Sequence, residues 1–285
     1  MCFYDLTLRD CFEILPVNFF FSLSFIMKIA SDFRAIFRFH IDALYARTPK
    51  RRPRQLDIDE AIDCLFKLVR TGMQWREVEL ASASYSTLFK HVKRWVTEGI
   101  MHASYSQILH KHVAAHPEKY YIVDSSHVKN AYGREGLGRS AVDRGRKGLK
   151  ISILTDSHGV VHNLKSDGAN RSDFQLFIPM LSSMFIELRR LEVFADRGYD
   201  SRSNRRGAYK RGFHPRIMRR RGRNSRRQNG KKAFVEHTFA WIDHFRRLRY
   251  QYEHSPLTHV SYTLLALGHL ISRRLAREDE QRASG

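Results

Sequence analysis

The sequence predicts a mixed α/β protein with a helical N-terminal part. The chain has 285 residues, of which 42% are hydrophobic, so it can bury a sizeable core and is not a disordered chain. Apolar residues recur at helical spacing between residues 56 and 98. After residue 118, short apolar runs typical of strands alternate with further helical segments, and this order favours α/β or α+β over all-α.

The chain is strongly basic. It carries 50 Lys and Arg against 29 Asp and Glu, a formal net charge of +21. The clustering of this charge favours a nucleic-acid partner over a merely soluble basic protein. The densest cluster spans residues 197–232, with 15 basic residues and one acidic residue. Arg predominates there, and its forked guanidinium suits phosphate.

Cysteine is scarce, and this indicates a reducing compartment. Cys2, Cys11 and Cys64 show no zinc-finger spacing, and their odd number is no disulfide framework.

The first 26 residues form a separate question. The apolar stretch 14–27 is too short for a confident membrane span, and it lacks the basic start and cleavage site of a secretory signal. We expect residues 1–26 to lie upstream of a true start at Met27. A membrane or partner tether is the alternative.

Residues 56–99 have the outline of a helix-turn-helix. A helix from Leu56 to Arg70 is followed by a short helix within 74–80, and Ser82 or Ser84 can cap a third helix that ends near Gly99. The outer face of the third helix is basic and is the expected base-reading surface. Its candidate DNA contacts are Lys90, Lys93 and Arg94. An ordinary helical bundle with a charged solvent face explains the pattern equally well.

The rest of the chain predicts a sheet with covering helices. Strands are expected at 120–123, 150–154, 160–164 and 191–195, with a short one near 215–218. Helices are expected at 173–191, 233–248 and 256–277, and a Gly- and Arg-rich loop at 133–148.

Three acidic residues stand out at the ends of these elements. Asp124 and Asp196 each follow an apolar strand, and Glu236 lies on a later helix. Asp156 is similarly placed, but its DSHG setting is an ordinary hairpin turn. Gathered carboxylates repel one another, and divalent cations remove that conflict. Mg²⁺ takes oxygen ligands, and two such ions can support phosphoryl transfer.

The sequence also resembles bacterial insertion-sequence transposases of the DDE type and, more distantly, Harbinger-like elements. The resemblance spans about residues 56–275. It is carried by TGMQWREV (71–78), YIVDSSHV (121–128), GRSAVDRGRKGLKISILTDSHGVV continuing to SDGANRSDF, VFADRGYDS (193–201) and VEHTFAWIDHFRRLRYQYEH (235–254).

This resemblance implies an RNase H-like catalytic core, preceded by the small helical domain. Asp124, Asp196 and Glu236 would be the catalytic residues and the ligands of two Mg²⁺ ions, with Mn²⁺ able to substitute. The domains would be a helix and basic linker at 27–55, a helical DNA-binding domain at 56–118, the catalytic domain at 119–278 and a tail at 279–285. Further candidate contacts to DNA are Lys150, Arg197, Arg246 and Arg247.

Two departures from the family pattern concern the Glu helix. The position after the Glu is usually Arg, and here it is His237, whose charge at neutral pH is not assured. A Tyr, an Arg and a Lys that frame the Glu in a related branch are replaced by Asn229, Lys232 and Asp243. Neither departure removes a metal ligand.

The resemblance implies an enzyme that binds inverted repeats in double-stranded DNA, cuts them and joins them to target DNA. It would act as a homodimer or larger assembly, without a membrane partner, in the bacterial cytoplasm at the nucleoid or in the nucleus of a eukaryotic host. One alternative is an inactive or domesticated DNA-binding protein. Another is an RNA-binding protein, which would explain the charge but not the acids at strand ends.

Overall fold

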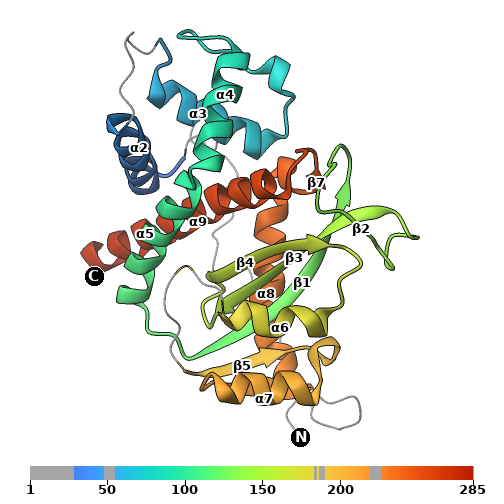
Figure 1. Ribbon diagram of the computed structural model, residues 1–285. Helices are drawn as coiled ribbons and strands as arrows, with labels where there is room; N and C mark the ends of the chain where they lie inside the picture. Colours follow the sequence, from blue (N-terminus) through green and yellow to red (C-terminus); the bar gives the residue numbers. More distant parts are fainter. Residues whose placement is uncertain (1–28, 48–54, 183–184, 186–189, 219–225, 285) are drawn as a thin grey trace, which may run out of the picture.

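The computed structural model describes residues 29–47, 55–182, 185, 190–218 and 226–284, without the side chains of 226–231 (Figure 1). The predictions for residues 1–26 and for most of the basic linker lie outside these ranges. No helix among the described residues has the length and apolar character needed to cross a bilayer.

The N-terminal part is helical, as predicted. Its elements are α2 (Ser31–Ala46), α3 (Ile58–Thr71), the 3₁₀ turn η1 (Trp75–Glu77), α4 (Tyr85–Thr97) and α5 (Ile100–Ala115). Asp57 caps α3 by accepting hydrogen bonds from two backbone amides, and Ser84 caps α4 by accepting one, from the Thr87 amide. The short helix expected within 74–80 is only a single 3₁₀ turn, and α5 was not predicted.

The described residues contain one mixed sheet. Its long strands are β1 (Tyr120–Asn130), β3 (Lys147–Asp156), β4 (Val161–Gly168), β5 (Glu192–Ala195) and β6 (His214–Ile217), in the order β4-β3-β1-β5-β6. Strand β3 is antiparallel to both β4 and β1, whereas β5 is parallel to β1 and β6 is parallel to β5. Two short strands, β2 (Gly138–Arg139) and β7 (Tyr250–Gln251), extend the sheet beside β3 and β1.

β1 continues well beyond its apolar start, so Asp124 lies inside this strand and not at its end. The second half of β1 pairs with the first half of β3, with His127 opposite Lys150 and Lys129 opposite Gly148. These residues lack the apolar pattern of a strand, so the sequence did not reveal the extension.

Helices and short turns complete this part of the chain. They are α6 (Asp173–Ser182), η2 (Arg197–Tyr199), α7 (Arg202–Lys210), α8 (Arg226–Asp243), η3 (Arg246–Leu248) and α9 (Pro256–Ser284). The predicted helix 173–191 is too long, because Phe185 already lies in a bend. The two C-terminal helices are confirmed, but α8 both begins and ends earlier than predicted, and α9 ends later.

Two hydrophobic clusters cover the two faces of the sheet. In β1, Ile122 belongs to the larger cluster, together with Val235 of α8 and the whole helical part. Tyr121 and Val123 belong to the smaller cluster, together with α6 and the α7 region. This alternation follows from the period of two in a strand. Figure 1 shows α6 and α8 on opposite sides of the sheet. The structure confirms the mixed α/β class and a helical region before the sheet.

Candidate active site

Asp124 and Asp196 lie at the same level on neighbouring strands. Val123 in β1 is paired with Ala195 in the parallel strand β5, and each aspartate is the next residue. In neighbouring parallel strands, the residues that follow a paired position lie beside each other. The two aspartates therefore line one small cavity, formed by Ile122, Val123, Asp124, Phe194, Ala195, Asp196, Lys232 and Val235.

The surroundings of Asp124 disfavour its negative charge, and a bound cation would offset this effect. It is half-buried, and its Oδ1 accepts a hydrogen bond of 2.9 Å from the Ser125 amide. Burial raises the pKa of Asp124, with further increases from the carboxylates of Asp196 and Asp173. The Ser125 amide and the Lys232 ammonium oppose this shift without cancelling it.

Asp196 is held in the charged form. Its Oδ1 accepts a hydrogen bond of 2.7 Å from the Arg197 amide and lies 3.0 Å from the Lys232 Nζ. Burial alone would raise the pKa of Asp196, but the Arg197 amide and the Lys232 ammonium outweigh it and lower the pKa.

Buried polar contacts hold the turn that follows Asp196. Tyr199 is fully buried, and its hydroxyl lies 2.7 Å from the Ser125 Oγ, which in turn lies 2.8 Å from the Ser152 Oγ. Ser201 caps α7, and Arg205 pairs with Asp200. The GYDS stretch is thus the scaffold that holds the second aspartate beside the first.

Glu236 is not part of this cavity. It is exposed on α8, one helical turn after Lys232. Among the described side chains, no three His, Cys, Asp or Glu gather closely enough to hold a metal ion. The structure therefore brings together two of the three predicted ligands and leaves the third outside.

The two aspartates nevertheless fit a divalent metal. They are hard oxygen donors on adjacent strands, and the burial and mutual repulsion acting on Asp124 favour a bound cation. A protein cation, the Lys232 ammonium, already lies against Asp196.

Sequence reasoning missed Lys232 and Asp173. Lys232 was noted only as a departure from a family pattern, and the ion pair with Asp196 depends on how α8 crosses the sheet. Asp173 begins α6 and influences Asp124 electrostatically, yet nothing in its sequence setting distinguishes it from an ordinary first-turn acid of a helix.

Two of the predicted DNA contacts lie inside the protein. Lys150 is 6% exposed, and its Nζ donates to the Arg171 carbonyl and to Asp173 Oδ1, at 2.6 and 2.8 Å. Arg247 is 7% exposed and binds the Met73 carbonyl and Glu253. Both predictions need correction, because these cations already have partners within the fold.

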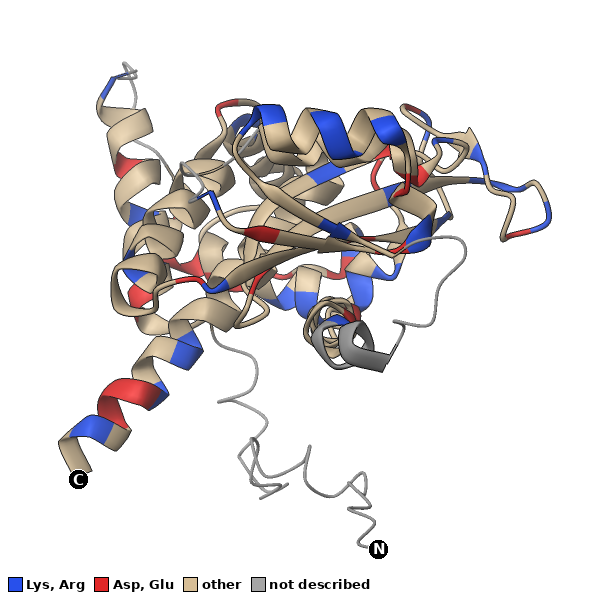
Figure 2. Ribbon diagram, turned by 90° about the horizontal axis from the view of Figure 1, so that it is seen from below, with Lys and Arg blue, Asp and Glu red and all other residues tan. Residues whose placement is uncertain are grey.

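The other candidate contacts are at or near the surface. Lys90, Lys93, Arg197 and Arg246 are exposed. Arg94 is half-buried, with its guanidinium 5.5 Å from the centre of the Tyr45 ring. In Figure 2, Lys and Arg occur on helices and loops over much of the molecule, so exposure alone does not identify a DNA-binding face.

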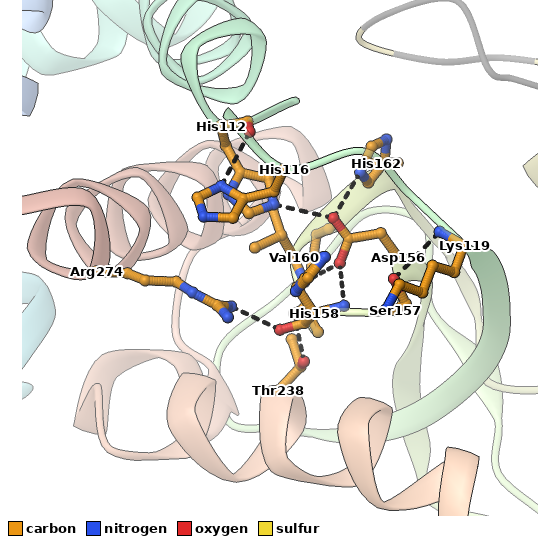
Figure 3. Close-up of polar contacts among 12 residues, drawn as sticks. His112, His116, Lys119, Asp156, Ser157, His158, Val160, His162, Thr238 and Arg274 are labelled. Carbon is orange, nitrogen blue, oxygen red and sulfur yellow. Dashed lines mark hydrogen bonds and ion pairs between the residues drawn. The ribbon is translucent and has the colours of Figure 1, made fainter. Parts of the chain in front are cut away.

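Asp156 has a different role from Asp124 and Asp196 (Figure 3). It is fully buried, and its Oδ2 accepts hydrogen bonds from the Nε2 atoms of His112 and His162, at 3.0 and 3.1 Å. Its Oδ1 accepts from the amides of His158 and Val160. Burial would raise the pKa of Asp156, but the two histidines hold it well below its usual range. With both oxygens occupied, Asp156 fastens the β3–β4 hairpin to α5.

The chain is similar in sequence to known transposases. Residues 115–267 match the family described as the transposase DDE domain. A putative transposase for insertion sequence element IS402 of Burkholderia cepacia is 32% identical over 169 residues, which cover 56% of this chain and 78% of the relative. The chain therefore belongs to the DDE transposase family.

Two solved structures are also similar. One is a pre-cleavage Mos1 transpososome, with 9% identity and a TM-score of 0.27 over 79% of this chain and 80% of that chain. The other is a paired-end complex of Mos1 transposase with the left transposon end, with 10% identity and a TM-score of 0.25 over 70% and 78%. Scores this low carry no inference about this chain.

Proposed function

We propose that this transposase binds the terminal inverted repeats of its element, cuts the DNA there and joins the freed ends to target DNA. Asp124, Asp196 and Glu236 are the proposed catalytic and metal-binding residues. The observation that carries this proposal is the register of β1 and β5, which brings Asp124 and Asp196 to one cavity.

In the proposed reaction, the acidic side chains bind the metal ions, and the metal ions act on the DNA. Asp124 and Asp196 would hold the metal ions from neighbouring strands of the sheet. When bound, two Mg²⁺ ions would activate the attacking oxygen and stabilise the leaving oxygen. Water attacks the phosphodiester at the element end and releases a 3′-hydroxyl, which then attacks a phosphodiester of the target. This chemistry requires no covalent link between protein and DNA.

Glu236 is proposed as the third ligand because it lies one turn beyond Lys232, which already reaches the site. Its entry requires a rearrangement of α8 relative to the position seen here. The exposed Lys90, Lys93, Arg197 and Arg246 are proposed contacts to the DNA backbone. Two element ends must be held together, so we also propose a homodimer or larger assembly on DNA.

Cleavage of a supercoiled plasmid that carries the element ends tests this proposal. The wild type should cut at the ends with Mg²⁺ or Mn²⁺ and not with a chelator. Asp124→Asn, Asp196→Asn and Glu236→Gln should each lose about a thousandfold in rate while still binding DNA. Binding without cutting in the wild type would instead indicate a catalytically inactive DNA-binding protein.

A further inference from the structure

Lys232 pairs with Asp196 and Lys150 pairs with Asp173, and the two ammonium groups differ in how firmly they are held. Lys150 is almost fully buried and makes two short contacts, to the Arg171 carbonyl and to Asp173. Lys232 is 26% exposed in its side chain, and its partner Asp196 is 48% exposed. Lys150 is therefore fixed at the start of α6, whereas Lys232 makes a solvent-accessible ion pair, a kind that contributes little to stability.

The Lys232 ammonium lies where a cation bound by Asp124 and Asp196 would lie. Its side chain lines the cavity with Asp124 and Asp196, pairs with Asp196 at 3.0 Å and lowers the pKa of Asp124 by its charge. Asp124 receives no ion pair from Lys232, so its negative charge is only partly compensated there.

We propose that Lys232 is a tethered counter-ion that competes with metal ions for the Asp124–Asp196 site. The inference rests on the proposed function, because it assumes that these two aspartates bind the metal. Without metal, the ammonium reduces the repulsion between the carboxylates. A divalent ion supplies twice the charge and displaces the ammonium toward solvent. The competition also explains why Glu236 lies outside the cavity. While the Lys232 ammonium occupies the site, no metal ion is present to attract a third carboxylate.

Mn²⁺ affinity, measured by isothermal titration calorimetry on the full-length protein without DNA, tests the competition. Lys232→Met removes the ammonium and keeps the length of the side chain, so Mn²⁺ should bind about tenfold more tightly than to the wild type. Lys210→Met is the matched control, because it removes the same charge from an exposed position on α7 that lines no part of the cavity. It should change the affinity less than twofold.

Thermal unfolding gives a second readout that does not depend on catalysis. In the absence of metal, Lys232→Met should unfold at or slightly below the wild-type temperature. Saturating Mn²⁺ should raise the unfolding temperature of Lys232→Met more than that of the wild type, because ligand stabilisation grows with affinity.

Asp124→Asn and Asp196→Asn separate the two proposals. If both weaken Mn²⁺ binding but Lys232→Met binds no more tightly than the wild type, the counter-ion proposal is overturned and the metal site stands. If neither aspartate variant changes Mn²⁺ binding, the metal site itself is wrong, and the counter-ion proposal fails with it.

Discussion

At the scale of single residues, Asp124 and Asp156 show how one residue type is given two roles. Both are acids in neighbouring strands, yet Asp156 receives four hydrogen bonds, whereas Asp124 receives one, from an adjacent amide. A carboxylate with saturated oxygens is a structural anchor. One that keeps free lone pairs at a cavity can bind a ligand.

Replacing Asp156 should damage stability and not the active site. Asp156→Asn removes the charge that faces His112 and His162 in a fully buried position, and this should cost about 3 kcal/mol in the free energy of unfolding. Urea unfolding at pH 7 measures the loss, with the exposed Glu135→Gln as the control. A loss no larger than in the control would show that the network is not stabilising.

Acid sensitivity should arise in part from His259. Burial lowers the pKa of His259 from 6.5 to about 4, so the folded protein keeps this ring neutral where the unfolded chain protonates it. Its contribution to stability is complete above pH 6.5 and is lost as the pH falls toward 4, by up to about 3 kcal/mol.

His259→Leu should therefore flatten the decline of unfolding free energy between pH 6.5 and 4. The exposed His254→Leu serves as the control in the same urea series. Parallel pH profiles for the wild type and His259→Leu would contradict the assignment.

At the scale of elements, the sequence predicted the helices and strands that have a clear local pattern. The cap of α4 at Ser84 and the end of α3 near Arg70 were predictable because each solves a local backbone problem, whereas the Asp57 cap of α3 was not predicted. The polar half of β1 was not predictable, because its residues have no apolar pattern and pairing with β3 holds them in the sheet. Likewise, the sequence predicted Asp124, Asp196 and Glu236 as one set, but the exposure of Glu236 depends on the tertiary position of α8.

The glycine that ends α3 allows an element-scale prediction. Gly72 and Gly99 both adopt left-handed backbone, with φ of +73° and +69°. A Cβ at Gly72 would lie 3.1 Å from the Arg246 Cβ, whereas one at Gly99 meets nothing within 4 Å. Gly99→Ala should cost about 1 kcal/mol from backbone strain alone, and Gly72→Ala about 2 kcal/mol, because crowding against η3 is added. Equal losses in urea unfolding would show that this contact relaxes freely.

At the scale of the whole molecule, the helical part and one face of the sheet share one core. The larger cluster joins residues from α2 to α9, and α9 packs against α2, α3 and α5 as well as β4. Arg247 adds a polar link from η3 to the Met73 carbonyl. The C-terminal helix of the predicted catalytic domain thus packs with the helical bundle, and the domain boundaries proposed from sequence do not correspond to separate cores.

This shared core predicts cooperative unfolding. Peptides from α3 to α5 and from β1 to β3 should lose hydrogen-exchange protection at the same urea concentration, as expected for a single cooperative unit. Mass spectrometry of exchange across a urea series measures both regions in one sample. Earlier loss of protection in the helical peptides would indicate that the helical part is an independent unit.

We propose that Asp124 contacts a catalytic metal ion, and a change of ligand chemistry tests this contact most directly. Mg²⁺ prefers oxygen ligands, whereas transition-metal ions accept sulfur more readily. Asp124→Cys should cut plasmid-borne element ends at less than about one-hundredth of the wild-type rate in Mg²⁺. Replacing Mg²⁺ by Mn²⁺ should restore at least about tenfold, and Asp124→Ala should gain nothing. Cleavage by both variants in Mg²⁺ at the wild-type rate would contradict the assignment of Asp124 to the catalytic centre.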